Sequence, residues 1–241
     1  MRRIWAILIV IAFLYFFFKD VLPALPEFGK VDLFTRVSFD IISKSTKGKY
    51  EPIEFKKSSN REEGSANVVT SIVVNYRSFD TLGEVTVLFT AAIGVGILSS
   101  ALRKRRFIEL EEHFVLKITS GVILPLVLLF GTYIFIHGHL TPGGGFPGGT
   151  VIALGILFML ISNSQFRVTD ASKHVEQISG VGYVILGLIG MALSGIFLTN
   201  FLPTGVIGDL FSAGVVPIVY VLIGFKVGAE LSSIVFEMKE G

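Results

Sequence analysis

Charged side chains are rare inside the long apolar blocks of this sequence, and those found there could take up protons or small cations. Lys226 and Glu230 lie within the last apolar block, at the i, i+4 spacing that places both on one helix face. They can pair with each other, although the Lys-then-Glu order is the less favourable one, which favours partners on other helices. Three interpretations stay open: a buried structural pair, a lysine in a proton relay, and a lysine that extends toward the lipid headgroups.

A second set of charged residues precedes another apolar block. Arg77, Asp80 and Glu84 fall at i, i+3 and i+7, which places them on one face of a helix. Arg77 and Asp80 can pair, and Glu84 is then the carboxylate farthest into the block. Burial favours the protonated form of a carboxyl group and a nearby cation favours the ionised form, so a group between these influences can exchange a proton or hold a sodium ion. The alternative is a solvated anchor at the membrane interface.

The segment 137–149 is the third candidate, because proline and glycine dominate it. No regular helix is expected there, and irregular backbone at membrane depth is tolerated only where it is buried in protein or lines a cavity. The segment could therefore line an ion path, or it could be a tight turn that packs two helices. Two histidines without a cysteine or a nearby carboxylate are too few for a metal ion, so no metal site is predicted. The candidate lining residues are His137, His139, Pro142, Gly143, Gly144 and Gly145.

These candidates lie in a sequence built from long apolar blocks. Of the 241 residues, 51% are hydrophobic, and several blocks reach the roughly 20 residues that a helix needs to cross the hydrocarbon core. In lipid every backbone polar group must be satisfied internally, so such blocks must be helices, and the alternation of barrel strands is missing. The sequence predicts an all-α membrane protein with about six transmembrane helices. The blocks are about 4–22, 82–102, 118–136, 150–163, 178–202 and 211–236.

The distribution of basic residues orients these helices. With both termini inside, the basic run 103–106 is cytoplasmic, and the short outside loops 137–149 and 199–212 contain no lysine or arginine. We therefore expect an N-in, C-in, multi-pass protein of the cell (plasma) membrane, with a long outside segment at 23–66 after the first helix. The first block has no A-x-A-like cleavage site after it, so we interpret it as a retained helix.

Composition excludes several kinds of chemistry. The sequence has no cysteine, which rules out thiolate-bound iron–sulfur clusters, disulfides and thiol catalysis within it. A net charge of +2 gives no reason to expect nucleic acid as a partner. No nucleophile–base arrangement and no nucleotide motif is present, so we predict no cofactor and no catalytic centre in this chain. Small residues four apart, Ala92 with Gly96 and Gly190 with Ser194, favour close helix packing, as in a subunit surrounded by others.

Two stretches resemble subunits of known antiporters. Residues 116–237, with the motif GHLTPGGGFPGG at 138–149, resemble the B (MnhB-like) subunit of Mrp-type multisubunit Na⁺/H⁺ antiporters. Residues 67–106, with the motif VVNYRSFDTLGEVTVL at 73–88, resemble the C-terminal end of the large A subunit of these antiporters. They also resemble the small E-type subunit that replaces that end in archaeal membrane-bound hydrogenase or sulfane reductase complexes.

The resemblance implies a subunit that helps to form an ion translocation path for Na⁺ or H⁺. It implies a functional carboxylate in the region of Asp80 and Glu84, with Glu84 the first choice, and it assigns no role to Lys226 or to the glycine-rich segment. An ion would pass along a path that neighbouring chains complete. The alternative functions are a structural subunit that seals the same complex, and an autonomous small channel or carrier.

The resemblance also predicts how the chain is divided and what surrounds it. A first domain, 1–106, and an MnhB-like domain, 107–241, would be joined near 103–113 and would touch each other in the complex. The expected partners are the lipid bilayer and other membrane subunits of the antiporter module. In a hydrogenase or sulfane reductase complex, a peripheral redox arm with Fe–S clusters would join them, and redox chemistry would belong to that arm.

Overall fold

The structure is a computed structural model that divides by its contacts into two units, Met1–Asp40 and Ile41–Gly241. The predicted junction at 103–113, with its basic run, lies outside the described residues. The residues described are 2–24, 35–47, 49–102, 114–168 and 170–240.

The first unit begins with a helical stretch that has an apolar surface. Helix α1 (Arg2–Phe16) continues into a π-helical turn, η1 (Phe17–Val21), and a 3-10 turn, η2 (Leu22–Ala24). Its described side chains are mostly exposed apolar groups, such as that of Trp5. The α-helical part has 15 residues, fewer than the roughly 20 that cross the hydrocarbon core, so the membrane span at 4–22 stays a prediction.

Five described helices are long and apolar enough to cross a membrane. Short helical segments precede them: α2 (Val37–Ser43), α3 (Val68–Ser71) and the π-helical turn η3 (Ile72–Tyr76). In the part of the chain that the structure describes, β structure is limited to isolated bridges. The predicted multi-pass all-α fold is confirmed. The long helices are α4 (Ser78–Leu102), α5 (Phe114–Ile136), α6 (Gly145–Ser162), α7 (Asp170–Ser194) and α8 (Val216–Glu240).

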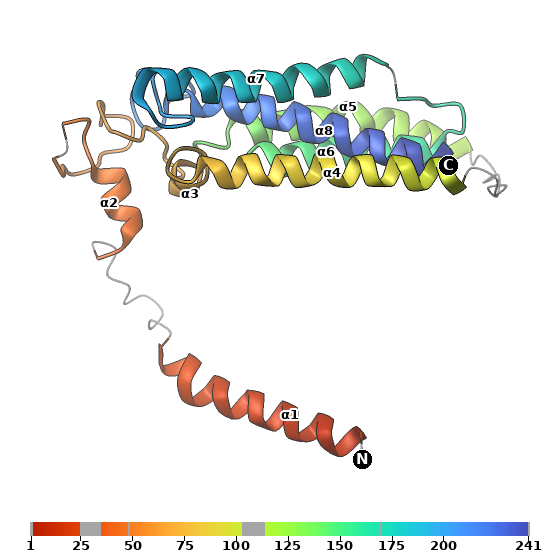
Figure 1. Cartoon of the computed structure of the whole chain (residues 1–241), viewed down its shortest axis with the longest axis horizontal. Coiled ribbons are helices and arrows are strands. Elements are labelled where there is room, and N and C mark those ends of the chain that lie inside the picture. The colour runs from red at the N-terminus through yellow and green to blue at the C-terminus, as the bar shows by residue number, and fades with distance from the viewer. Residues whose placement is uncertain (1, 25–34, 48, 103–113, 169, 241) are drawn as a thin grey trace. The chain divides into compact units, whose positions relative to one another are not determined.

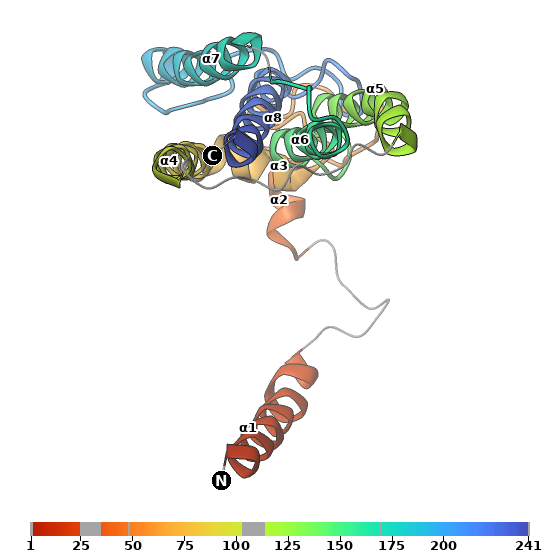
Figure 2. The ribbon, with the colours of Figure 1, turned by 90° about the vertical axis from the view of Figure 1, so that its right-hand side faces the viewer.

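Helix α8 is the centre of this bundle. The long helices lie side by side and alternate in direction (Figure 1). Helix α8 packs against α4, α5, α6 and α7, and Figure 2 shows it between α4 and α7 on one side and α5 and α6 on the other. In its most apolar window 56% of the residues are buried, against 11% for α4 and for α5. Polar side chains on α8 are therefore the ones most shielded from lipid.

Helix α6 begins earlier than the sequence predicted. We expected no regular helix in 137–149, but α6 starts at Gly145 and continues through Pro147. The expectation was wrong because proline in the first helical turn loses no intrahelical hydrogen bond. Glycine is needed here for close packing, since a Cβ atom on Gly149 would lie 2.7 Å from the carbonyl oxygen of Gly224 on α8.

Helix α7 lies nearer the N-terminus than its predicted span, 178–202. It begins at Asp170 and ends at Ser194, where Gly195 adopts a φ of +77°, as glycine often does at a helix C-terminus. The predicted span was uncharged, but the helix itself includes Glu176. The polar turns before the apolar run therefore belong to the helix.

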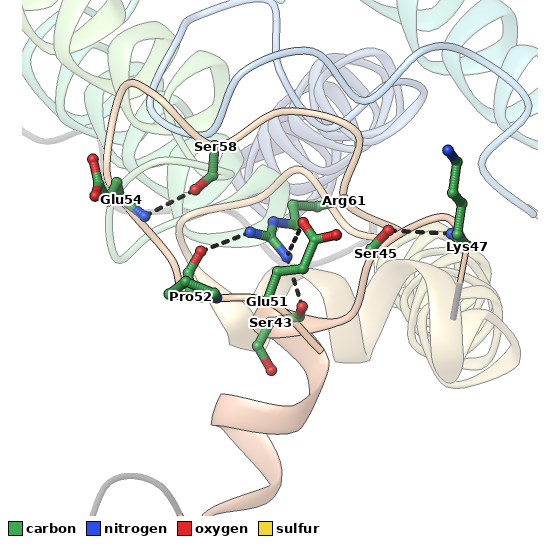
Figure 3. Close-up of polar contacts among 8 residues, drawn as sticks. All are labelled: Ser43, Ser45, Lys47, Glu51, Pro52, Glu54, Ser58 and Arg61. Atoms are coloured by element: carbon green, nitrogen blue, oxygen red, sulfur yellow. Dashed lines mark hydrogen bonds and ion pairs between the residues drawn. The ribbon is translucent and has the colours of Figure 1, made fainter. Parts of the chain in front are cut away.

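Residues 43–47 and 49–67 form a folded cap at the end of the bundle where α4 and α8 begin. Arg61, only 3% exposed, holds the cap together from its interior (Figure 3). Its guanidinium donates hydrogen bonds to the carbonyl oxygens of Ser43, at 2.8 Å, and Pro52, at 2.7 Å. Glu51 lies 3.5 Å from the same group. The predicted outside segment is thus an ordered structure over much of its length.

The cap rests on the connection between α7 and α8. The Thr204 hydroxyl donates a 2.7 Å hydrogen bond to the carbonyl oxygen of Arg61, and Ser59 forms an isolated antiparallel bridge with Val206. A Cβ atom on Gly64 would lie 2.3 Å from the Thr204 carbonyl oxygen, so the backbones meet there without a side chain between them. The cap and the α7–α8 connection therefore contact each other directly, while the division of the chain into two domains stays a prediction.

Candidate ion-translocation site

Lys226 lies at the centre of the candidate site. Its Nζ atom is 3.0 Å from Oε2 of Glu230 on the same helix and 3.0 Å from Oε1 of Glu176 on α7. The Lys226 side chain is 9% exposed and that of Glu230 is 1% exposed. The ammonium group also lies 5.0 Å from the centroid of the Phe89 ring on α4, a cation–π contact. Side chains from three helices thus surround one buried ammonium group.

Lys226 and Glu230 were predicted from the sequence, and Glu176 was not. The pairing of Lys226 with Glu230 is present, and Glu176 is the partner on another helix that the Lys-then-Glu order favoured. Glu176 was missed because the predicted span began at 178, after the polar turns of α7. No sequence motif marks Glu176. The only signal was that a buried lysine with one unfavourably placed carboxylate is expected to have a second carboxylate as its partner.

A cleft of about 310 Å³ lies beside this group, between α4, α7 and α8. Glu176 and Glu230 line it, and so does Glu237, farther along α8. On the α4 side the wall includes Ala92 and Gly96, the small pair that predicted close helix packing. The lack of a side chain at Gly96 leaves room for the Glu237 carboxylate, since a Cβ atom there would lie 2.8 Å from its Oε2 atom. The cleft therefore gives the buried charges a space that water or an ion can occupy.

The second set of candidates lies at the start of α4. The Arg77 guanidinium pairs with the Asp80 carboxylate at 2.5 Å, as predicted, and their side chains are 68% and 49% exposed. An exposed pair of this kind contributes little to stability. Glu84 is also exposed in the isolated chain. Its carboxylate lies within electrostatic range of the hydroxyl groups of Tyr183 on α7 and Tyr220 on α8.

The glycines of the loop between α5 and α6 pack against α5 and α8. Gly143 and Gly144 adopt φ angles of +154° and +140°, which residues with side chains rarely adopt. A Cβ atom on Gly144 would lie 3.1 Å from the Tyr220 ring, and one on Gly145 would lie 2.6 Å from Cβ of Ile223. Packing accounts for glycine at these positions. A role of the loop in lining an ion path stays a prediction.

The two histidines of this loop have different environments. His137 stacks on Tyr133, with ring centroids 4.2 Å apart, and Pro142 is exposed. His139 is fully buried, and burial lowers the pKa of its imidazole, so the neutral form is favoured. Among the described residues, no group of three or more His, Cys, Asp or Glu side chains is placed to hold a metal ion.

Hydrogen bonds join the loop to the short helix before α4. The Asn67 amide donates to the carbonyl oxygen of Gly138 at 3.0 Å, and the Thr70 hydroxyl donates to the same oxygen at 2.8 Å. The Asn67 backbone N–H donates to the carbonyl oxygen of His139 at 3.0 Å. The Tyr220 hydroxyl then donates to Thr70 at 3.0 Å. These bonds tie the loop to residues 67–70, and residues 67–70 are tied in turn to α8 through Tyr220.

Glu63 in the cap is a buried carboxyl group that sequence analysis did not single out. It is 4% exposed, and the Asn75 amide donates to its Oε2 atom at 2.6 Å. Burial raises the pKa of Glu63 to about 7. A neighbouring lysine, Lys44, pairs with Glu62 at 2.6 Å. In the sequence, Glu62 and Glu63 lie in a polar stretch where solvent exposure is the ordinary expectation. Neighbouring residues in the sequence do not indicate that the cap buries one of the two.

The fold and the charged group buried within it define a multi-pass helical membrane protein with ionisable residues inside its spanning helices. Residues 115–233 match the family described as a domain related to the MnhB subunit of Na⁺/H⁺ antiporters, and residues 31–114 match the family of the E-type subunit of MBH. The chain belongs to the MnhB-related family, with a segment of the E-type MBH family joined in front. The latter match takes in most of the 23–66 stretch, which lies outside the resemblance seen in the sequence motifs.

Relatives extend these matches over nearly the whole chain. A chain of the archaeal membrane-bound sulfane sulfur reductase, a respiratory membrane complex, superimposes with a TM-score of 0.75 and 39% identity, covering 98% of this chain and 97% of that one. The Mrp complex of Dietzia sp. DQ12-45-1b gives a TM-score of 0.60 and 27% identity, covering 73% of this chain but 21% of that chain. An uncharacterised protein of Methanocaldococcus jannaschii is 28% identical in an alignment that covers 70% of this chain and 76% of that protein.

Proposed function

We propose that this chain is a membrane subunit of a multisubunit Na⁺/H⁺ antiporter module and helps to form its ion path. The observation that carries the proposal is the buried ammonium group of Lys226 between Glu176 and Glu230, beside a cleft. A charged group at the centre of a spanning helix costs about 2.5–3.5 kcal/mol on insertion scales. Such a group is retained where it pairs and serves a path for ions or protons.

The geometry of Lys226 suits a relay better than a fixed structural pair. The two carboxylates lie at equal distances of 3.0 Å from its Nζ atom and belong to different helices. The Lys226 ammonium group donates a hydrogen bond to Glu176 and forms an ion pair with Glu230, so it contacts both carboxylates at once and can shift toward either one when the other is protonated. A proton or cation that arrives at one carboxylate would move the lysine toward the other.

Glu84 would serve the same path nearer the cap. It precedes Phe89 by five positions on α4, a rise of about 7.5 Å, and the Phe89 ring contacts the Lys226 ammonium group. Because Glu84 is exposed in the isolated chain, a neighbouring subunit would have to supply the other wall of a hydrated passage past it. Asp80, paired with Arg77, would hold the start of that passage at the membrane surface.

The likeness to the sulfane sulfur reductase chain supports a respiratory complex of that kind as the setting. In that setting the chain spans the plasma membrane with both termini inside and the cap outside, and it contacts other membrane subunits. A peripheral arm with Fe–S clusters would belong to other polypeptides, because this sequence has no cysteine. Na⁺ and H⁺ are the transported ions in this proposal.

Transport by the assembled complex tests the proposal. Glu176→Gln and Glu230→Gln are introduced into the complex, Na⁺-dependent proton movement is followed in membrane vesicles, and assembly is checked on native gels. Transport should fall about a hundredfold, the low end for a positioned proton-transfer group, while assembly is preserved. Glu54→Gln, which alters an exposed cap residue paired with Lys57, serves as the control. Lost assembly would instead favour a structural subunit, and unchanged transport in an intact complex would refute the proposal.

A further inference from the structure

One face of α8 presents oxygen atoms to the cleft without hydrogen-bond partners. Glu230, Ser233 and Glu237 follow each other at i, i+3 and i+7, so they share that face, and all three line the cleft. Oε1 of Glu230 has no partner, its Oε2 has only the ion pair with Lys226, and the Ser233 hydroxyl has no partner either. Buried acceptors of this kind call for water or an ion.

The charges around the cleft do not balance. Glu176, Glu230 and Glu237 line it, and Lys226 is the one cation that contacts them among the interactions described. Glu237 is exposed near the end of α8, but Glu176 and Glu230, when ionised, already leave one negative charge in excess over Lys226 within the spanning region. Charges at such depth are paired or matched by an ion, and a bound cation would restore part of the balance.

The ligand type and the space limit which cation fits. Carboxylate and hydroxyl oxygens suit hard cations, and neither histidine nor cysteine lines the cleft, so softer transition metals are not favoured. A volume of about 310 Å³ accommodates an ion with several waters, since one water occupies about 30 Å³ of liquid. Among the described residues no three carboxylates converge to hold a metal directly, which suits a weakly held, hydrated ion that must leave again.

We propose that this cleft is a binding site for a hydrated monovalent alkali cation, held by Glu230, Ser233 and Glu237 of α8 with Glu176 opposite. The proposal deepens the proposed function, on which it rests for the choice of ion, by naming where within this chain the ion pauses. Lys226 contacts Glu176 and Glu230 and offsets part of their negative charge. The ion is therefore held without a full set of direct ligands.

Gly96 on α4 allows the site to be perturbed without removing a charge. A Cβ atom at this position would lie 2.8 Å from Oε2 of Glu237, so Gly96→Ala must push that carboxylate aside. The displaced atom is the end of a flexible side chain, and the fold should tolerate the change. Gly94, on the same helix, has nothing within 4 Å of its Cβ position. Gly94→Ala is therefore the matched control.

Labelling of the assembled complex tests the site directly. Carbodiimides modify protonated carboxyl groups in apolar surroundings, and a cation bound at the carboxylate protects it. The complex is treated with dicyclohexylcarbodiimide over a series of Na⁺ concentrations, with choline as the control cation, and labelling of Glu230 and Glu237 is read by peptide mass spectrometry. Na⁺ should protect both residues and choline should protect neither.

The variants then identify the ligands. Gly96→Ala and Ser233→Ala should each raise the Na⁺ concentration needed to protect Glu230 by about tenfold, as loss of a supporting group does in other ion sites, and Gly94→Ala should not. If Na⁺ does not protect Glu230 in the unaltered complex, the proposed cation site is refuted. This holds even if Glu230→Gln abolishes transport and the proposed function stands. Protection that persists unchanged in both variants also overturns the site. Protection with the predicted shifts supports the site, even if Glu230→Gln still transports and the proposed function fails.

Discussion

Glu63 should make the stability of the cap depend on pH, and glutamine in its place should remove that dependence. The carboxyl group is 4% exposed and accepts a hydrogen bond from Asn75. Burial raises its pKa from 4.5 to about 7, so the folded cap binds this proton more tightly than the unfolded chain does. The resulting stabilisation is fully present below pH 4.5 and is lost as the pH rises through about 7.

The size of this effect follows from the two pKa values. A rise from 4.5 to about 7 corresponds to about 3 kcal/mol between the protonation states. Glu63→Gln keeps an oxygen that accepts the hydrogen bond from Asn75, but it cannot ionise. At low pH the variant and the unaltered cap should be nearly equally stable, and at about pH 8 the variant should be more stable by up to about 3 kcal/mol.

Hydrogen–deuterium exchange of cap peptides in the intact complex measures this difference. Both proteins are compared at the same pH, so that the intrinsic dependence of exchange on pH cancels in the ratio of their rates. The ratio should change by up to about a hundredfold between about pH 4.5 and about pH 8. Glu54→Gln, whose parent side chain is 63% exposed, should show no such change. A ratio for Glu63→Gln that is the same at every pH would refute the assigned burial.

Two further predictions concern the hydrogen bonds of the cap and the packing of the bundle. Arg61→Met leaves the carbonyl oxygens of Ser43 and Pro52 without their donor, which should destabilise the cap by about 3 kcal/mol. Trypsin should then cleave after Lys57 faster than in the unaltered protein, and an unchanged cleavage rate would contradict the prediction. Gly149→Ala places a Cβ atom 2.7 Å from a backbone oxygen of α8, which should cost about 1–3 kcal/mol. The thermal midpoint of the complex should therefore fall. Gly121→Ala should leave the midpoint unchanged, because its Cβ position has nothing within 4 Å. Equal midpoints for the Gly149→Ala and Gly121→Ala variants would contradict the close packing at Gly149.

The arrangement of spans followed from hydropathy because lipid permits few alternatives. Apolar blocks of sufficient length must be helices, and the structure has long helices at 78–102, 114–136, 145–162, 170–194 and 216–240. Helix ends were less predictable. Polar turns of α7 before its apolar run still belong to the helix, and α6 begins at Gly145 because Pro147 in its first turn loses no intrahelical hydrogen bond.

The candidate site was predictable only in part, for a related reason. Spacing on one helix indicated that Lys226 and Glu230 pair, since i, i+4 geometry is fixed by the helix itself. Contacts between helices leave no such spacing in the sequence, so Glu176 was not found. The folded cap and the buried Glu63 were missed because they depend on Arg61 and on contacts with the α7–α8 connection.

The candidate site contains residues from both the part that resembles the antiporter A subunit and the part that resembles the B subunit. This gives a physical reason for joining the two parts in one chain. Helix α4 supplies the Phe89 ring against the ammonium group and the open position at Gly96, while α7 and α8 supply the charged groups. Without α4 the cleft would lose one wall, and Lys226 would face lipid or water. Because α4 and α8 belong to one polypeptide, they are present in equal numbers and stay close to each other. The hydrogen bonds from Asn67 and Thr70 to the α5–α6 loop fix how the two parts align at the cap end. Separate polypeptides would have to achieve the same alignment by association alone.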